Sequence, residues 1–154
     1  MSERLSRDQV ERLVETYVAF RNTGDSGGLE ALVDDGIADE PTVAGLVQMD
    51  GMVRTAFPDW HMEPGDVWYD EVAQAGLFHY EASGTFEGEW CPMNELEGYR
   101  FAPTGESFRF SGVQLFRFED GRLVDTSGYK DSITFATQAG ILPEMTELAS
   151  AVSQ

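Results

Sequence analysis

The chain has 154 residues, of which 42% are hydrophobic and 12% aromatic, and its formal net charge is -18. This composition fits one folded domain with its own core and excludes an intrinsically disordered chain. Twenty-eight acidic residues against ten basic ones also exclude a nucleic-acid groove as a first hypothesis, because phosphate contacts need clustered lysine and arginine.

Helices are predicted in the first part of the chain. Ser6 begins a capping box, and apolar side chains at helical spacing predict a first helix over about 7–22. A short second helix is predicted over 29–34. Thr42 is expected to cap a third helix, which ends before the turn at 57–60.

Strands follow the helices. They are predicted over 61–69 and 73–87, and a loop rich in proline, glycine and glutamate extends over 90–107. Because helices come first and long strands afterwards, the fold class is α+β. We expect a single domain over 1–154 with its core at about 7–142.

The next segment reads as a β-hairpin that ends at a carboxylate. Apolar and polar residues alternate along the strand that begins near Phe110, and Asp120-Gly121 supplies the backbone angles of a two-residue turn. If the strands close on that turn, Asp131 lies opposite Phe110. It would then share a face with these residues: Tyr129, Ser127, Asp125, Gln114, Gly112 and Phe116. A one-residue bulge would move Asp131 to the other face.

Asp131 has two interpretations. A carboxylate on an aromatic-lined face of a curved sheet is a candidate general base, because burial raises a carboxyl pKa toward neutrality. Alternatively, Asp131 caps the helical turn predicted over 132–139 by accepting from the amide of Ile133 or Thr134. A tail helix over about 143–152 follows that turn.

Several motifs occur in a fixed order along the chain. They are 57–60 (FPDW), 83–85 with 88–89 (SGT and GE), 103–105 (PTG), 118–124 (FEDGRLV) and Asp131 followed by 138–140 (QAG). Together they resemble the SnoaL-like polyketide cyclases of the nuclear-transport-factor-2-like superfamily, over residues 7–142.

The resemblance implies a fold and a reaction. The fold is a cone, in which a strongly bent antiparallel sheet holds the N-terminal helices on its concave face around an apolar pocket. The reaction is an intramolecular aldol cyclisation or a related isomerisation of a small carbonyl compound. It uses no cofactor, and its acid/base aspartate matches Asp131. The resemblance also implies a homodimer formed through the outer face of the sheet.

The sequence departs from the family pattern at three places. Phe86 stands where histidine is frequent, 125–127 (DTS) stands where Glu-His-Trp is frequent, and 90–99 resembles an insertion. These differences change the pocket wall and its mouth, and with them the expected substrate.

The remaining pocket residues are assigned by residue type and position. Gln114, Tyr129 and His79 are candidate polar contacts to a substrate or its enolate oxygen. Trp60, Phe110 and Phe116 are candidates for the apolar wall. Two histidines without a His-x-His pattern do not indicate a metal site, so we expect no metal.

Two other functions remain open on the same scaffold. One is a noncatalytic protein that binds a small apolar ligand in the pocket. The other is an epoxide hydrolase or dehydratase, in which Asp125 would orient water if its side chain pointed inward. The substrate is expected to be small and apolar in each case, with neither nucleic acid nor membrane as a partner.

The charge pattern is informative about habitat. Lys130 is the single lysine, and the acids are spread along the chain rather than gathered in a tail. Loss of lysine with an evenly acidic surface is typical of proteins from a high-salt cytoplasm. We therefore expect a cytoplasmic protein of a halophile.

Stability is accordingly expected to rise with salt. At about 1 M salt the Debye length falls to about 3 Å, which screens the self-repulsion of the acidic surface. The melting temperature should be higher in molar potassium chloride than in dilute buffer. Equal melting temperatures would contradict the halophilic interpretation.

Overall fold

The computed structural model describes residues 4–92 and 98–142, and the predicted tail helix lies outside these residues. Three helices come first: α1 (Arg7–Thr23), α2 (Gly27–Asp34) and α3 (Glu40–Ala56). Four strands and a short helix follow: β1 (His61–Asp70), β2 (Ala75–Thr85), β3 (Ser107–Glu119), β4 (Arg122–Lys130) and α4 (Ser132–Gln138).

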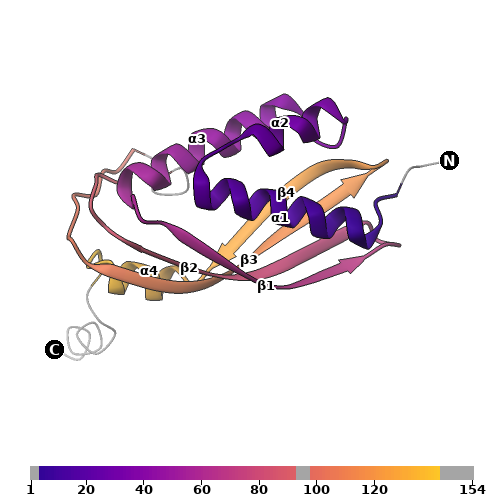
Figure 1. Ribbon diagram of the computed structural model, residues 1–154. Helices are drawn as coiled ribbons and strands as arrows, with labels where there is room; N and C mark the ends of the chain where they lie inside the picture. Colours follow the sequence, from indigo (N-terminus) through magenta and orange to yellow (C-terminus); the bar gives the residue numbers. More distant parts are fainter. Residues whose placement is uncertain (1–3, 93–97, 143–154) are drawn as a thin grey trace.

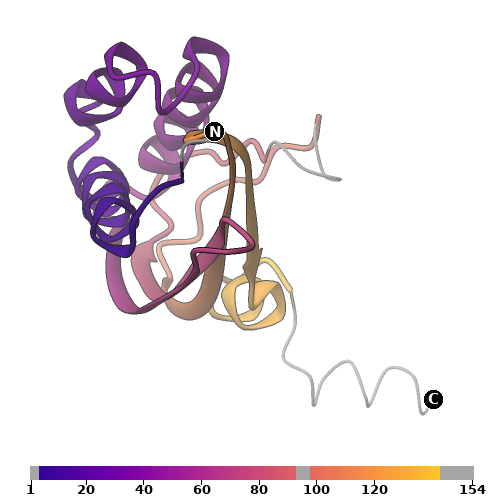
Figure 2. The same ribbon diagram turned by 90° about the vertical axis from the view of Figure 1, so that its right-hand side faces the viewer.

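The strands form one open antiparallel sheet in the order β1-β2-β3-β4. Helices α1, α2 and α3 cover one face of the sheet, and α4 lies at the end where β4 stops (Figure 1). Seen from the end, the sheet curves beneath the helices (Figure 2). The α+β fold with helices on the concave face is therefore confirmed. In the described part of the chain, no helix is long and apolar enough to cross a membrane.

Local sequence explains where the first helices begin. Ser6 accepts from the amide of Gln9, and the Gln9 side chain accepts from the Ser6 amide, so the predicted capping box is present. The predicted cap of α3 is wrong by three residues. Asp39 is the N-cap and its carboxylate accepts from the amide of Thr42, because a carboxylate before a proline-containing first turn satisfies the free amides well.

Aromatic side chains form most of the core beneath the helices. Alternate residues of β2 and β3 point inward, and Tyr17 of α1 packs edge-on against Phe78 and Phe116 at 6.0 and 5.9 Å. Phe57, at the end of α3, contacts Phe108 and the α4 residue Phe135 in the same edge-on way. This packing fixes the positions of α1, α3 and α4 relative to the sheet.

Candidate functional site

A cavity of about 560 Å³ lies between the helices and the concave face of the sheet. This volume is in the range of pockets that hold small organic ligands. Its walls come from α1, α3, the segment between α3 and β1, β2, the segment after β2, β3, β4 and α4. The described lining residues are Tyr17, Arg21, Leu46, Met49, Met52, Val53, Phe57, Trp60, Tyr80, Trp90, Cys91, Pro92, Phe110, Gln114, Thr126, Gly128, Tyr129, Lys130, Ser132 and Phe135.

The charge of this lining is opposite to that of the whole chain. Although the sequence has 28 acidic residues, none of the described lining residues is Asp or Glu. Two cations, Arg21 and Lys130, line the cavity. The site therefore favours a ligand that carries negative charge or develops it during reaction.

Arg21 is fixed by a buried ion-pair cluster behind the cavity. Its Nε donates to Asp50 at 3.0 Å and its Nη1 donates to the Tyr17 hydroxyl at 3.0 Å. The second Asp50 oxygen accepts from Arg54 at 2.7 Å. Burial opposes the charge of Arg21, but its interactions with Tyr17 and Asp50 outweigh that effect and raise its pKa. One carboxylate thus serves two guanidinium groups, which leaves the cluster with a net positive charge.

Lys130 comes from the last residue of β4 and lies among aromatic rings. Its Nζ is 5.1 Å from the ring centre of Phe135, 5.6 Å from Trp90 and 5.9 Å from Phe110. Much of the residue is nevertheless accessible to solvent. Desolvation of the ammonium, and then the positive charge of Arg21, lower the pKa of Lys130.

Neutral hydrogen-bonding groups complete the site. Burial raises the pKa of Tyr80 to about 12, so its hydroxyl keeps its proton at neutral pH and can donate it in a hydrogen bond. Gln114 is buried and lines the cavity. The buried indole N–H of Trp60 lacks a partner in the described part of the chain. A ligand with carbonyl oxygens could pair with such groups.

The predicted hairpin register is wrong beyond its turn. Asp120 and Gly121 have φ of 51° and 75°, as expected, but the register shifts between Arg117 and Phe118. The bulge moves every later residue of β4 to the opposite face. Lys130 pairs with Gly112 and therefore faces the cavity.

The predicted placement of Asp131 on the cavity face is also wrong, for the same reason. Its amide donates to the carbonyl of Ser111, and its exposed carboxylate accepts from the amide and hydroxyl of Thr134 at 3.0 and 2.7 Å. These hydrogen bonds lower the pKa of Asp131, which is opposite to what a general base at neutral pH needs. The carboxylate caps α4.

Three other predicted residues lie away from the cavity. His79 is exposed and pairs with Val113 on the outer face of the sheet, so its prediction as a pocket contact is wrong. Asp125 is exposed opposite Arg117 and does not point inward. Phe116 is buried in the core beneath Tyr17 and does not line the cavity.

The remaining predicted residues do line the cavity. Trp60 and Phe110 form part of its aromatic wall, and Gln114 contributes a polar group to it. Tyr129 borders the cavity but is 69% exposed and pairs with Val113, so it belongs to the outer face.

Substitutions of Asp131 test whether its carboxylate caps α4 or acts in catalysis. Asp131→Asn is expected to leave any turnover unchanged, since the side chain lies outside the cavity and asparagine caps a helix well. Asp131→Ala is expected to lower the melting temperature. Because the folded-state pKa is lowered, this loss should be present at neutral pH and should disappear as pH falls through that pKa. Loss of turnover in a folded Asp131→Asn protein would contradict the placement.

Sequence reasoning missed Arg21, Asp50 and Lys130 as site residues. Arg21 continues the apolar face of α1, four residues after Tyr17, and Asp50 lies on the inner side of α3. A charge at a position that should be apolar signals a buried pair. Lys130 was signalled by being the single lysine of the sequence.

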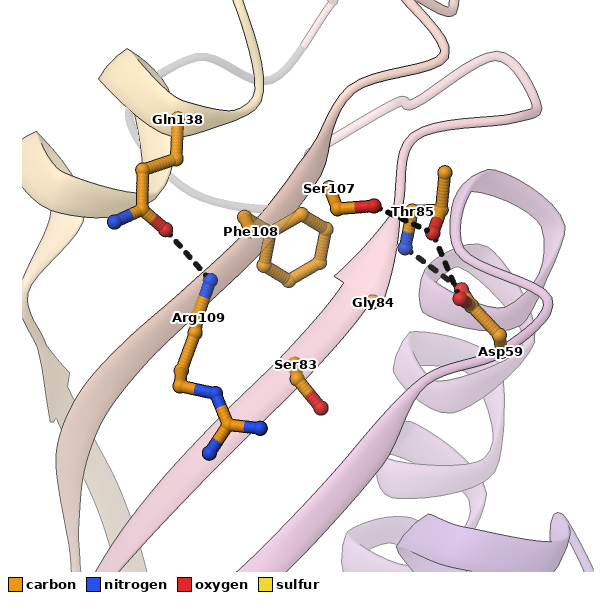
Figure 3. Close-up of a pocket in the computed structure, with 8 residues that line it drawn as sticks. All are labelled: Asp59, Ser83, Gly84, Thr85, Ser107, Phe108, Arg109 and Gln138. Atoms are coloured by element: carbon orange, nitrogen blue, oxygen red, sulfur yellow. Dashed lines mark hydrogen bonds between the residues drawn. The ribbon is translucent and has the colours of Figure 1, made fainter.

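A second hollow, of about 380 Å³, lies on the outer side near the end of β2 (Figure 3). Most of its polar residues form a hydrogen bond to another lining residue. Asp59 accepts from the amide and hydroxyl of Thr85 at 2.7 and 2.8 Å, and the Arg109 amide donates to Gln138 at 2.7 Å. These bonds tie α4 and the β1 entry to the sheet, so we regard this hollow as structural.

Comparison with known proteins identifies relatives of this fold. The family model described as SnoaL-like polyketide cyclase matches residues 11–139. AclR from Streptomyces galilaeus, a candidate hydroxylase, has a TM-score of 0.67 at 22% identity, over 96% of both chains. TsrD from Streptomyces laurentii has a TM-score of 0.68 at 19% identity, over 90% of this chain and 99% of its own. IdmH from Streptomyces antibioticus, a candidate polyketide cyclase, has a TM-score of 0.56 at 21% identity, over 86% and 99%. No curated protein matches the chain.

Proposed function

Because the chain belongs to the SnoaL-like polyketide cyclase family, we propose that its cavity takes a small aromatic carbonyl compound and moves a proton beside the carbonyl. The observation that carries the proposal is the lining itself, which combines aromatic walls with two cations and has no carboxylate among its described residues. Removal of that proton gives an enolate, whose negative charge such a lining stabilises.

Lys130 is the proposed acid/base group. Its pKa is lowered, so a larger share of the amine is unprotonated than in a solvated lysine. When the amine accepts the proton from carbon, it becomes an ammonium beside the new enolate. Arg21 adds a fixed positive charge, and Tyr80 can donate to the carbonyl oxygen. The enolate carbon could then attack a second carbonyl and close a ring, or take the proton back at another carbon.

The test is exchange of the carbon-bound protons beside the carbonyl for solvent deuterium. A probe such as 1-phenylpropan-2-one would be incubated with the protein in D2O containing molar potassium chloride and followed by proton NMR. Exchange faster than in buffer, and equally fast with Asp131→Asn, would support the proposal. If the protein accelerated exchange for none of a panel of aromatic ketones, the proposed catalytic function would be contradicted.

The second candidate is a noncatalytic binding protein. The observation in its favour is that the expected aspartate base lies outside the cavity, capping α4. Such a protein would be stabilised by the same ketones without accelerating their exchange. An epoxide hydrolase receives no support, because Asp125 is exposed on the outer face.

A further inference from the structure

Lys130 is the one lysine in a chain whose basic residues are otherwise arginine. Arginine would serve equally well, or better, to place a positive charge over aromatic rings. It differs from lysine in one relevant respect: guanidinium does not lose its proton in proteins, whereas a lysine amine can become a nucleophile. The presence of lysine at this position, and at no other in the sequence, is therefore consistent with amine chemistry.

The surroundings of Lys130 are those of an activated amine. Its Nζ lies within 5.1–5.9 Å of three ring centres, and the cationic Arg21 lines the same cavity. Desolvation and a nearby cation both favour the neutral, nucleophilic amine. The attraction of the ring faces for an ammonium instead favours the protonated form, and it holds the Lys130 side chain in place.

The amine is also accessible to a ligand. Lys130 is exposed although its Nζ lies among rings, and its backbone neighbour across the sheet is Gly112, which has no side chain to cover it. A Cβ on Gly112 would be 2.4 Å from the Tyr80 hydroxyl oxygen, so this glycine lets the Tyr80 ring lie against β3 beside the lysine. A carbonyl group in the cavity could thus meet an amine nucleophile and a phenolic donor together.

We infer that Lys130 forms a covalent imine with an aldehyde or ketone bound in the cavity. This inference rests on the proposed function, in which the ligand is a carbonyl compound, and it adds a covalent step to it.

The step needs no other reactant. The amine nitrogen forms a bond to the carbonyl carbon, and one amine proton passes to the oxygen, giving a carbinolamine. The carbinolamine oxygen takes up a proton from water, and loss of water then breaks the C–O bond and leaves a protonated imine. The iminium attracts electrons from the adjacent C–H bond, whose proton passes to water, giving an enamine that can attack a second carbonyl. Addition of water reverses the sequence and restores the lysine.

The experiment is reductive trapping on the intact chain. The wild-type protein would be incubated with 1-phenylpropan-2-one in molar potassium chloride, reduced with sodium cyanoborohydride, digested and examined by peptide mass spectrometry. The single lysine makes the position of the secondary amine unambiguous, and the α-amino group of the same chain is an internal control. We expect the adduct on Lys130 in large excess over the α-amino group, and its loss in urea-unfolded protein and in Lys130→Arg.

The outcomes separate this inference from the proposed function. Accelerated deuterium exchange without an adduct on Lys130 would overturn the imine and leave acid/base catalysis standing. Neither exchange nor adduct would overturn both. An adduct found equally on Lys130 and the α-amino group would also overturn the imine, because it would show ordinary amine reactivity.

Discussion

Replacement of Lys130 by methionine is expected to slow proton exchange on a ketone substrate by about 10²- to 10⁴-fold, the usual contribution of a positioned acid/base group. Methionine keeps the length of the side chain and packs well against aromatic rings. It removes an ammonium that is partly desolvated but also attracted by three aromatic rings, so the two effects oppose each other and the melting temperature should change little. The slower proton exchange would then result from the missing amine and not from a disrupted fold.

The measurement is the NMR exchange rate of the Lys130→Met protein beside that of Asp131→Asn. The two positions are adjacent in sequence, but one faces the cavity and the other caps α4. We expect the first substitution to lose activity and the second to keep it. The reverse pattern would restore Asp131 as the base and contradict the account of the cavity.

The second large effect is expected at Asp50. Asp50→Asn would leave the Arg21 guanidinium, whose residue is 6% exposed, without its counter-charge. Breaking a buried ion pair by removing one partner typically costs about 3–5 kcal/mol. Urea unfolding in molar potassium chloride would measure this loss.

The chain offers a matched control for that experiment. Arg7 and Glu11 form an ion pair of 2.9 Å on the exposed surface of α1, nearly the same length as the 3.0 Å pair of Arg21 and Asp50. Glu11→Gln should change the free energy of unfolding by at most about 1 kcal/mol, because water solvates an exposed charge that has lost its partner. Similar losses at both positions would show that Asp50 is not the buried anchor of Arg21.

Much of the fold could be predicted from local sequence patterns. The capping box at Ser6, the helical spacing of α1 and the Asp120-Gly121 turn each depend on residues close in the chain, and all three were predicted correctly. The register of β4 was not, because a bulge beside Phe118 has no local signature in the sequence. One inserted position exchanged the faces of Lys130 and Asp131, so the predicted site contained the wrong member of that pair.

The charged part of the site depends on contacts between distant segments. Arg21 and Asp50 are 29 positions apart, and their pairing follows from how α1 and α3 pack, which helical periodicity does not specify. The cavity itself is assembled from eight segments of the chain. Sequence patterns could indicate aromatic walls at Trp60 and Phe110, but they could not show which polar groups meet there.

Ligand binding in the cavity is the claim on which every proposed function depends. The most direct measurement is the ligand-induced shift in melting temperature, for aromatic ketones in molar potassium chloride, in the wild type and in Gly128→Leu. Gly128 lines the cavity, and a side chain there would begin 3.0 Å from the Gln114 oxygen, within the space that a ligand needs. At about 100 times the Kd, binding adds about 2.7 kcal/mol, which corresponds to a shift of about 5–10 °C. We predict this shift in the wild type and its loss in a folded Gly128→Leu protein, whereas equal shifts in both would place the ligand elsewhere.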